Sequence, residues 1–136
     1  MLQTSHYNLK MPELNDFVDV TVLNENMETL DQAVHENRVV VGSYTGDGTA
    51  SREIVLGFAP RAVYLCDHYG CVGDGLNHNN LCGGLALQDV PVFSGDTTVL
   101  SLTQNGFMVY GNTSKPSATP CSNSVNLSPF RYVAWP

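Results

Sequence analysis

Apolar positions in residues 19–34 (DVTVLNENMETLDQAV) follow a seven-residue repeat. They are alternately three and four residues apart, at Val20, Leu23, Met27, Leu30 and Val34. This is the spacing of a coiled-coil seam, whereas a helix that packs on its own domain usually shows a wider apolar stripe. Asp19 precedes the repeat and is a favourable N-cap. We therefore predict a helix from about residue 20 to about residue 35 that associates through this seam with copies from other chains.

From residue 38 onward the apolar period changes from seven to two, which is typical of strands. The candidate strands are RVVVGSY, REIVLGF, RAVYLCD, LALQDVPVF, TTVLSLT, GFMVYG and RYVAW. Turn sequences TGDG, SGD and QNG separate several of them, and Asn-Gly in QNG favours a type I′ hairpin turn. The pattern predicts a mainly β chain: residues 1–37 carry the helix, and residues 38–136 form an antiparallel, jelly-roll-like β-sandwich.

Two long polar stretches, residues 67–84 and 111–129, do not fit a strand pattern. Loops of this length within a domain often have a function. The first stretch offers an aromatic face and several amide and imidazole groups that can hydrogen-bond to hydroxyls. The candidate ligand-binding residues are Tyr69, Asn77, His78, Asn79 and Asn80. The alternative is that both stretches are solvated connections without a ligand.

Cysteine and histidine residues in the same region allow a second interpretation, a zinc site. Its ligands would come from Cys66, His68, Cys71, His78 and Cys82, and Cys121 lies farther along the chain. The spacing is irregular and contains no CxxC pair, unlike that of most tight zinc modules. We therefore expect reduced, metal-free thiols, no cofactor, and Cys66 as a small buried apolar residue.

Charge is unevenly distributed along the chain. Residues 1–37 contain seven acids and one base, whereas the rest contains six acids and five bases, for a net charge of −7. No basic face is visible for nucleic acid, and there is no polybasic membrane patch. No apolar run approaches the length of a membrane span, and the first residues lack the features of a secretion signal. We expect a soluble chain that is made in the cytoplasm.

Motifs for catalysis are absent from the sequence: there is no G-x-S-x-G, P-loop, G-x-G-x-x-G or H-E-x-x-H pattern. Asp67, Asp74 and Asp89 could supply the two carboxylates of a glycosidase. Turn formation is the more common role of Asp in such Gly-rich segments. We therefore expect a protein that is not an enzyme.

Several short motifs together resemble those of tail-fibre and receptor-binding proteins from phages and prophages of Gram-positive bacteria. Residues 7–34 (YNLKMPELNDFVDVTVLNENMETLDQAV) resemble the segment that precedes a short helix in those proteins. GSYTGDG, IVLGFAPRAVYL, GFMVYG and the final YVAW are similar to motifs of their β-structured tip domains.

The resemblance implies a tip protein of a phage tail fibre, located in the virion and assembled as a trimer. The short helix would be a coiled-coil collar that holds three sandwiches in register, and the N-terminal segment would attach to other tail proteins. The loops would bind a bacterial surface, with its carbohydrate as the expected receptor. The alternative is a purely structural collar or cap of the virion without a ligand, and a glycan-cleaving tail enzyme is a third interpretation.

Overall fold

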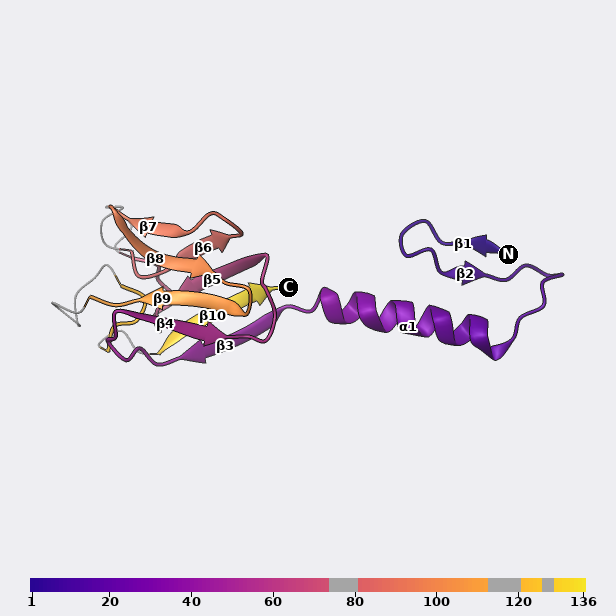
Figure 1. Cartoon of the computed structure of the whole chain (residues 1–136), viewed down its shortest axis with the longest axis horizontal. Coiled ribbons are helices and arrows are strands. Elements are labelled where there is room, and N and C mark those ends of the chain that lie inside the picture. The colour runs from indigo at the N-terminus through magenta and orange to yellow at the C-terminus, as the bar shows by residue number, and fades with distance from the viewer. Residues whose placement is uncertain (74–80, 113–120, 126–128) are drawn as a thin grey trace. The chain divides into compact units, whose positions relative to one another are not determined.

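A computed structural model describes residues 1–73, 81–112, 121–125 and 129–136 (Figure 1). The chain divides into two compact units, Met1–Arg38 and Val39–Pro136. The first unit contains one helix and a small β-ribbon, and the second contains two four-stranded sheets. Each unit is described by itself below.

The N-terminal unit is built on helix α1 (Val20–Glu36), close to the predicted range. The Asp19 carboxylate caps it, accepting hydrogen bonds from the backbone N–H groups of Thr21 at 2.8 Å and Val22 at 3.3 Å. These bonds satisfy two of the amide groups that a helix leaves unpaired at its start. The predicted helix and its cap are therefore confirmed.

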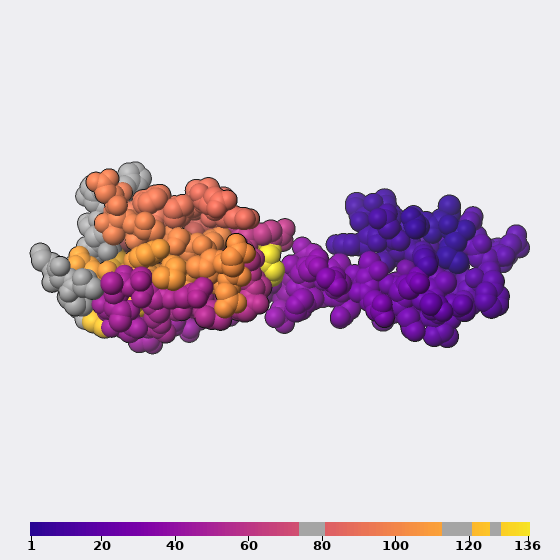
Figure 2. Space-filling view, viewed as in Figure 1, coloured from indigo at the N-terminus to yellow at the C-terminus, as the bar shows by residue number. Residues whose placement is uncertain are grey.

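The segment before the helix folds back along it, which the sequence analysis did not predict. Strands β1 (Leu2–Gln3) and β2 (Lys10–Met11) form a small antiparallel ribbon. Asn26 of α1 binds the backbone of Lys10 twice, accepting from its N–H at 2.8 Å and donating to its carbonyl at 2.9 Å. The Lys10 ammonium also forms an ion pair with Glu25. Figure 2 shows the ribbon along one side of the helix.

The second unit is an antiparallel β-sandwich, as the alternating pattern predicted. One sheet has the order β3-β10-β5-β6 and the other the order β4-β9-β8-β7. The strands of the first sheet are β3 (Val40–Tyr44), β10 (Phe130–Trp135), β5 (Ala62–Cys66) and β6 (Gly84–Leu87). Those of the second are β4 (Ser51–Val55), β9 (Gly106–Tyr110), β8 (Thr97–Leu102) and β7 (Val92–Ser94).

Two kinds of connection build these sheets. The chain changes sheet between β3 and β4, between β4 and β5, between β6 and β7, and between β9 and β10. Strand β10, the last in the chain, lies between β3 and β5. By contrast, β7, β8 and β9 are neighbours in chain order and form a simple meander.

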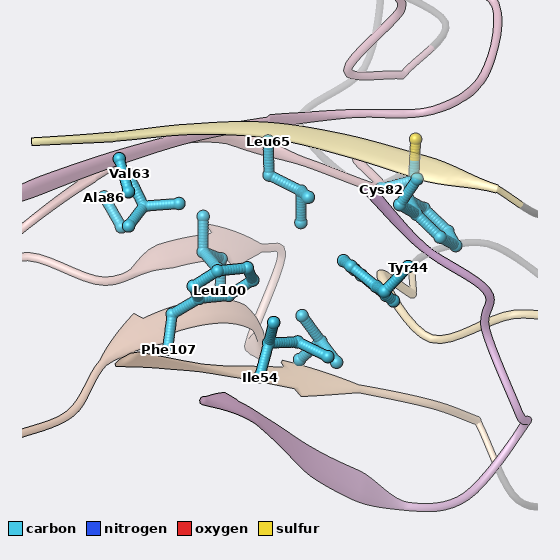
Figure 3. Packing of buried hydrophobic residues seen from close by; sticks show 11 residues of the cluster. Tyr44, Ile54, Val63, Leu65, Cys82, Ala86, Leu100 and Phe107 are labelled. Atoms are coloured by element: carbon cyan, nitrogen blue, oxygen red, sulfur yellow. The ribbon is translucent and has the colours of Figure 1, made fainter. Parts of the chain in front are cut away.

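The core lies between the two sheets (Figure 3). Phe107 of β9 is fully buried, and its ring meets that of Tyr132 edge-on at 5.0 Å between centroids. Tyr44 stacks on Phe130 with centroids 5.2 Å apart. Alternate residues of both sheets complete the cluster, among them Ile54, Val63, Leu65, Ala86, Leu100, Val109 and Ala134.

Two local predictions were wrong. The stretch LALQDVPVF is not one strand: a turn at Gln88–Asp89 divides it into β6 and β7, which belong to different sheets. Asp89 takes a φ of 60°, in the left-handed region that Asp tolerates better than most residues. Leu87 and Val90 close this turn with reciprocal backbone hydrogen bonds.

The QNG hairpin between β8 and β9 exists, but its turn is not type I′. A type I′ turn needs positive φ at both central residues, and neither Asn105 nor Gly106 has one. Gly106 instead opens β9 where a Cβ atom would come within 2.0 Å of the Ile54 carbonyl oxygen. Close approach between neighbouring strands, rather than turn geometry, requires this glycine.

Candidate functional site

Connections of the sandwich divide between its two ends. Residues 45–50, 67–83, 95–96 and 111–129 connect strands at the end opposite Val39, which we call the loop end. The other end, called here the Val39 end, has the shorter connections 56–61, 88–91 and 103–105. Antiparallel pairing alone causes this division. Both long polar stretches singled out from the sequence therefore join strands at the same end.

Backbone hydrogen bonds close the base of the first long loop, residues 67–83. The backbone N–H of Asp67 donates to the Cys71 carbonyl at 2.9 Å, and Cys82 N–H donates to the Val72 carbonyl at 2.8 Å. Gly73 and Leu81 form an antiparallel bridge at the limit of the described residues. Residues 67–73 and 81–83 therefore form a stem, and the sequence between them starts and ends at this bridge.

Asp67 organises the turn at the start of the stem. It is only 7% exposed, and one of its carboxylate oxygens accepts hydrogen bonds from the N–H groups of Tyr69 and Cys71, both at 2.9 Å. This is an Asx-type turn, in which a carboxylate replaces a backbone acceptor. The prediction that Asp67 forms a turn is confirmed.

This turn presents Tyr69 to solvent. The Tyr69 side chain is 77% exposed, and its ring lies against the His68 imidazole with centroids 3.7 Å apart. The Arg131 guanidinium donates to the His68 carbonyl at 2.7 Å and ties the turn to β10. The Nδ1 atom of His68 is buried without a hydrogen-bond partner. The described part of the stem thus offers one exposed aromatic face on a fixed backbone.

Tyr69 is the one predicted ligand-binding residue whose position the structure describes. Asn77, His78, Asn79 and Asn80 lie outside the described residues. The observed stem fixes the positions of Gly73 and Leu81, the described residues on either side of this segment.

Residues 121–124 are not part of an exposed polar loop, contrary to the interpretation of 111–129 as one recognition or solvated stretch. Cys121, Ser122, Asn123 and Ser124 are all buried. Ser122 and Asn123 both donate from the backbone to the Tyr110 carbonyl, at 2.9 and 3.0 Å. Their side chains also have partners, because the Ser122 hydroxyl donates to the Val99 carbonyl. This segment extends the core toward the loop end.

Asn123 is the centre of this buried polar segment, and no simple sequence motif indicates it. Its amide donates to the Asp47 carboxylate at 2.6 Å and to the Thr49 hydroxyl at 3.0 Å. Its side-chain oxygen accepts from Asp47 N–H at 3.2 Å. Gly46 faces the same segment, and a Cβ there would lie 2.2 Å from the Ser124 carbonyl oxygen. The TGDG turn is therefore locked onto residues 122–124.

This network stabilises the ionised form of the Asp47 carboxylate. The Thr49 hydroxyl and N–H groups donate to its carboxylate at 2.6 and 3.0 Å. These bonds, assisted by Asn123 and the nearby Arg52, lower the pKa of Asp47 to about 2. Asp47 is thus ionised throughout the physiological range and holds the turn between β3 and β4.

Two of the thiols at the loop end, those of Cys66 and Cys82, are poor candidates for nucleophiles. Burial raises the pKa of Cys82 to about 12 and also raises that of Cys66. The described residues contain no group of three or more His, Cys, Asp or Glu side chains that could hold a metal ion, and His78 lies outside them. The expectation for Cys66 was partly wrong, since it is half-buried on the outer side of β5, whereas Cys82 and Cys121 are buried.

The carboxylates considered for catalysis are not brought together where the structure describes them. Asp67 follows β5 at the loop end, whereas Asp89 follows β6 at the Val39 end. Asp74 lies outside the described residues.

The predicted helical seam is exposed along its whole length. Its five residues range from 38% exposed at Leu30 to 70% at Val34. The ribbon leaves them uncovered because it binds the neighbouring flank of α1, through Glu25 and Asn26. Residues 1–38, all of which the structure describes, include no buried side chain.

Comparison with protein-family models, curated proteins and solved structures finds no match to this chain. Within the part of the chain that the structure describes, no helix is long and apolar enough to cross a membrane.

Proposed function

We propose that this protein is a self-associating adhesin, the tip of a phage tail fibre, whose loop end recognises a bacterial surface glycan. The observation that carries the proposal is the position of the long polar loops, which all connect strands at the end opposite Val39. A fibre tip needs its recognition surface at the end away from the point where the chain enters.

The chemistry of the stem supports a sugar ligand. Tyr69 offers an exposed aromatic face on a turn fixed by Asp67, and such a face can stack on the apolar side of a sugar ring. The segment that starts at the stem contains Asn77, His78, Asn79 and Asn80, which can donate to and accept from sugar hydroxyls. Because Tyr69 is held by backbone bonds, little conformational entropy is lost when it binds.

Self-association is supported by the exposed seam. Five large apolar side chains on one stripe of α1 are exposed in the part of the chain that the structure describes, and their spacing suits copies of the same helix. Burial of a half-exposed side chain of this size yields on the order of 1 kcal/mol, so the stripe contributes several kcal/mol per chain. A trimer is the assembly that the resemblance implies.

Attachment through the N-terminal segment is supported by two further apolar side chains. Leu14 and Phe17, between the ribbon and the helix, are 103% and 86% exposed. Two such side chains close together in sequence fit a binding partner better than they fit solvent. We assign them to contact with another tail protein.

A binding assay with bacterial cells tests the recognition function. Labelled full-length protein is expected to bind cells of a Gram-positive host, in competition with free wall glycan. Replacing Tyr69, His78 and Asn79 together by Ala should abolish binding with little change in melting temperature, since exposed substitutions usually shift stability by under about 0.5 kcal/mol.

A matched control lies at the Val39 end of the sandwich. Gln88→Ala with Gln104→Ala changes exposed polar side chains far from the stem and should leave binding intact. Full binding by the triple variant would remove the stem loop from the function. Absence of binding by the unmodified protein across a broad panel of hosts would favour the structural collar or cap, and release of new reducing ends from wall glycan would favour the enzyme.

A further inference from the structure

The two sheets of the sandwich have very different outer faces. On sheet β3-β10-β5-β6, one row of outward side chains crosses all four strands in register: Val41 pairs with Val133, Val133 with Tyr64, and Tyr64 with Leu85. A second row runs from Trp135 through Ala62 to Leu87. We call these seven residues the apolar face.

Charge is almost absent from this face. Among the outward residues of its four strands, all of which the structure describes, Arg131 is the only one with a charged side chain. Its guanidinium is already bonded to the His68 carbonyl at 2.7 Å. Val41 is 72% exposed and Leu85 54% exposed, so solvent reaches both edges of the row.

The outer face of the other sheet carries more polar side chains, together with Met108 and the exposed Val55. Its corresponding row pairs Glu53 with Met108 and Met108 with Ser101. The Thr103 hydroxyl donates to Glu53 at 2.6 Å, and the hydroxyls of Ser101 and Tyr110 lie 2.9 Å apart. A sandwich normally shows polar residues on both outer faces, so the apolar face is the exception that needs a partner.

The shape of the apolar face also suits a partner of the same kind. Two open hollows flank β10 and are lined mostly by apolar atoms. One, of about 460 Å³, lies over β3 and β10 between Val41 and Val133. The other, of about 220 Å³, lies over β10 and β5 beside Tyr64. Protruding side chains of an identical face, such as Tyr64 and Leu85, can enter these hollows.

The short linker between α1 and β3 favours other copies of this chain as the partner of the apolar face. Helix α1 ends at Glu36 and β3 starts at Val40, so the linker spans at most roughly 14 Å. Helices that associate through the seam have axes about 8–10 Å apart. Whatever the angle between the two units, association through the seam would keep the starts of the β3 strands of two copies within roughly 40 Å of one another. Strand β3 carries the first residue of the apolar face.

We infer that the apolar face is the surface through which the sandwiches of neighbouring copies contact one another. The inference rests on the self-association in the proposed function and does not depend on glycan recognition. Seam and face would then hold one assembly together by two separate surfaces.

Substitution on the two outer faces of the full chain tests this inference. Val41→Asp with Leu85→Asp places charges on the apolar face, and Val55→Asp is the matched control, since Val55 is 62% exposed on the outer side of β4. Light scattering across a concentration series is expected to show association at least 100-fold weaker for the double variant and unchanged for the control. Circular dichroism should show an intact fold in both.

A natural probe adds a second measurement, because Trp135 is the single tryptophan of the chain and belongs to the apolar face. Its emission should shift to shorter wavelength as the unmodified protein associates, and it should not shift in the double variant. A folded double variant that associates and shifts like the unmodified protein would overturn the inference while leaving the seam and the adhesin function untouched. An unmodified protein that is monomeric at all concentrations would remove self-association altogether.

Discussion

The N-terminal unit and the sandwich differ in how their apolar residues are used. The sandwich buries large side chains completely, including Phe107, Phe130, Leu65 and Leu100. The helix buries none, and its ribbon is attached through polar and ionic contacts to Asn26 and Glu25. The sandwich therefore has a buried core of its own, whereas no side chain of the helix is buried within the part of the chain that the structure describes.

Helix propensity alone gives α1 little stability. An isolated helix of 17 residues is marginal in water even with strong helix formers, and α1 contains Val, Thr and Asn. Lys10 of the ribbon pairs with Glu25 of the helix within the same unit. This exposed pair contributes under about 1 kcal/mol, so burial of the seam in the proposed assembly would supply the larger share of the stabilisation.

The largest expected effect is on the sandwich core. Phe107→Ala should lower the free energy of unfolding by about 3–5 kcal/mol, because it removes a fully buried ring packed against Tyr44 and Tyr132. Chemical denaturation followed by circular dichroism measures this loss. Met27→Ala, on the exposed seam, should leave the sandwich transition in place; equal losses for both variants would contradict the distinction between the units.

The next effect is on assembly. Leu23→Asp with Leu30→Asp should weaken association by about 100-fold, roughly 3 kcal/mol, because charges enter the shared seam. Helical signal should fall while the melting transition of the sandwich stays in place. Sedimentation and far-ultraviolet circular dichroism test both statements, and a sandwich that unfolds with the helix would show that the two units are not independent.

A smaller effect is expected at the helix cap. Asp19→Ala removes the acceptor for the N–H groups of Thr21 and Val22 and should destabilise the helix by about 1 kcal/mol. Asp19→Asn keeps an acceptor and should retain most of the stability. Helical signal as a function of temperature distinguishes the two variants, and identical melting of both would rule out a role for the cap.

The smallest effect concerns acid. Hydrogen bonds from Thr49 lower the pKa of Asp47 to about 2 in the folded protein, below its ordinary value near 3.9. The stability that Asp47 contributes is therefore fully present above about pH 5 and is lost as pH falls toward 2. Asp47→Asn should flatten this part of the stability curve. Because Asp47 is exposed, the change should be small, and an unaltered curve would exclude it as a contributor.

Much of the fold could be read from local patterns. The heptad spacing and Asp19 predicted the helix, and alternation with turn residues predicted most strands. The stretch LALQDVPVF was wrongly predicted to be one strand because apolar residues stand on both sides of its turn. Backbone hydrogen bonds between Leu87 and Val90 close this turn, where the chain passes from one sheet to the other. The type I′ turn predicted for QNG was wrong because Gly106 is required by a contact with β4, which is distant in sequence.

The site was harder to predict than the fold. Tyr69 could be proposed from its residue type, but the burial of Asn123 depends on partners about 75 residues earlier in the chain, at Asp47 and Thr49. The apolar face did leave a signal in the sequence. AVYL and GLAL are apolar at consecutive positions, which indicates strands covered on both sides, whereas TTVLSL mixes polar and apolar residues.

The position of β10 has a consequence for biosynthesis. This strand lies between β3 and β5, yet it is the last of the eight sandwich strands to leave the ribosome. Until Phe130–Trp135 emerges, β3 and β5 have no strand to join them, and Phe130 and Ala134 are missing from the core. The sandwich therefore completes its fold only after synthesis of this segment. Under the proposed association through the helices, nascent chains on one messenger would start to associate before any of them has a finished sandwich.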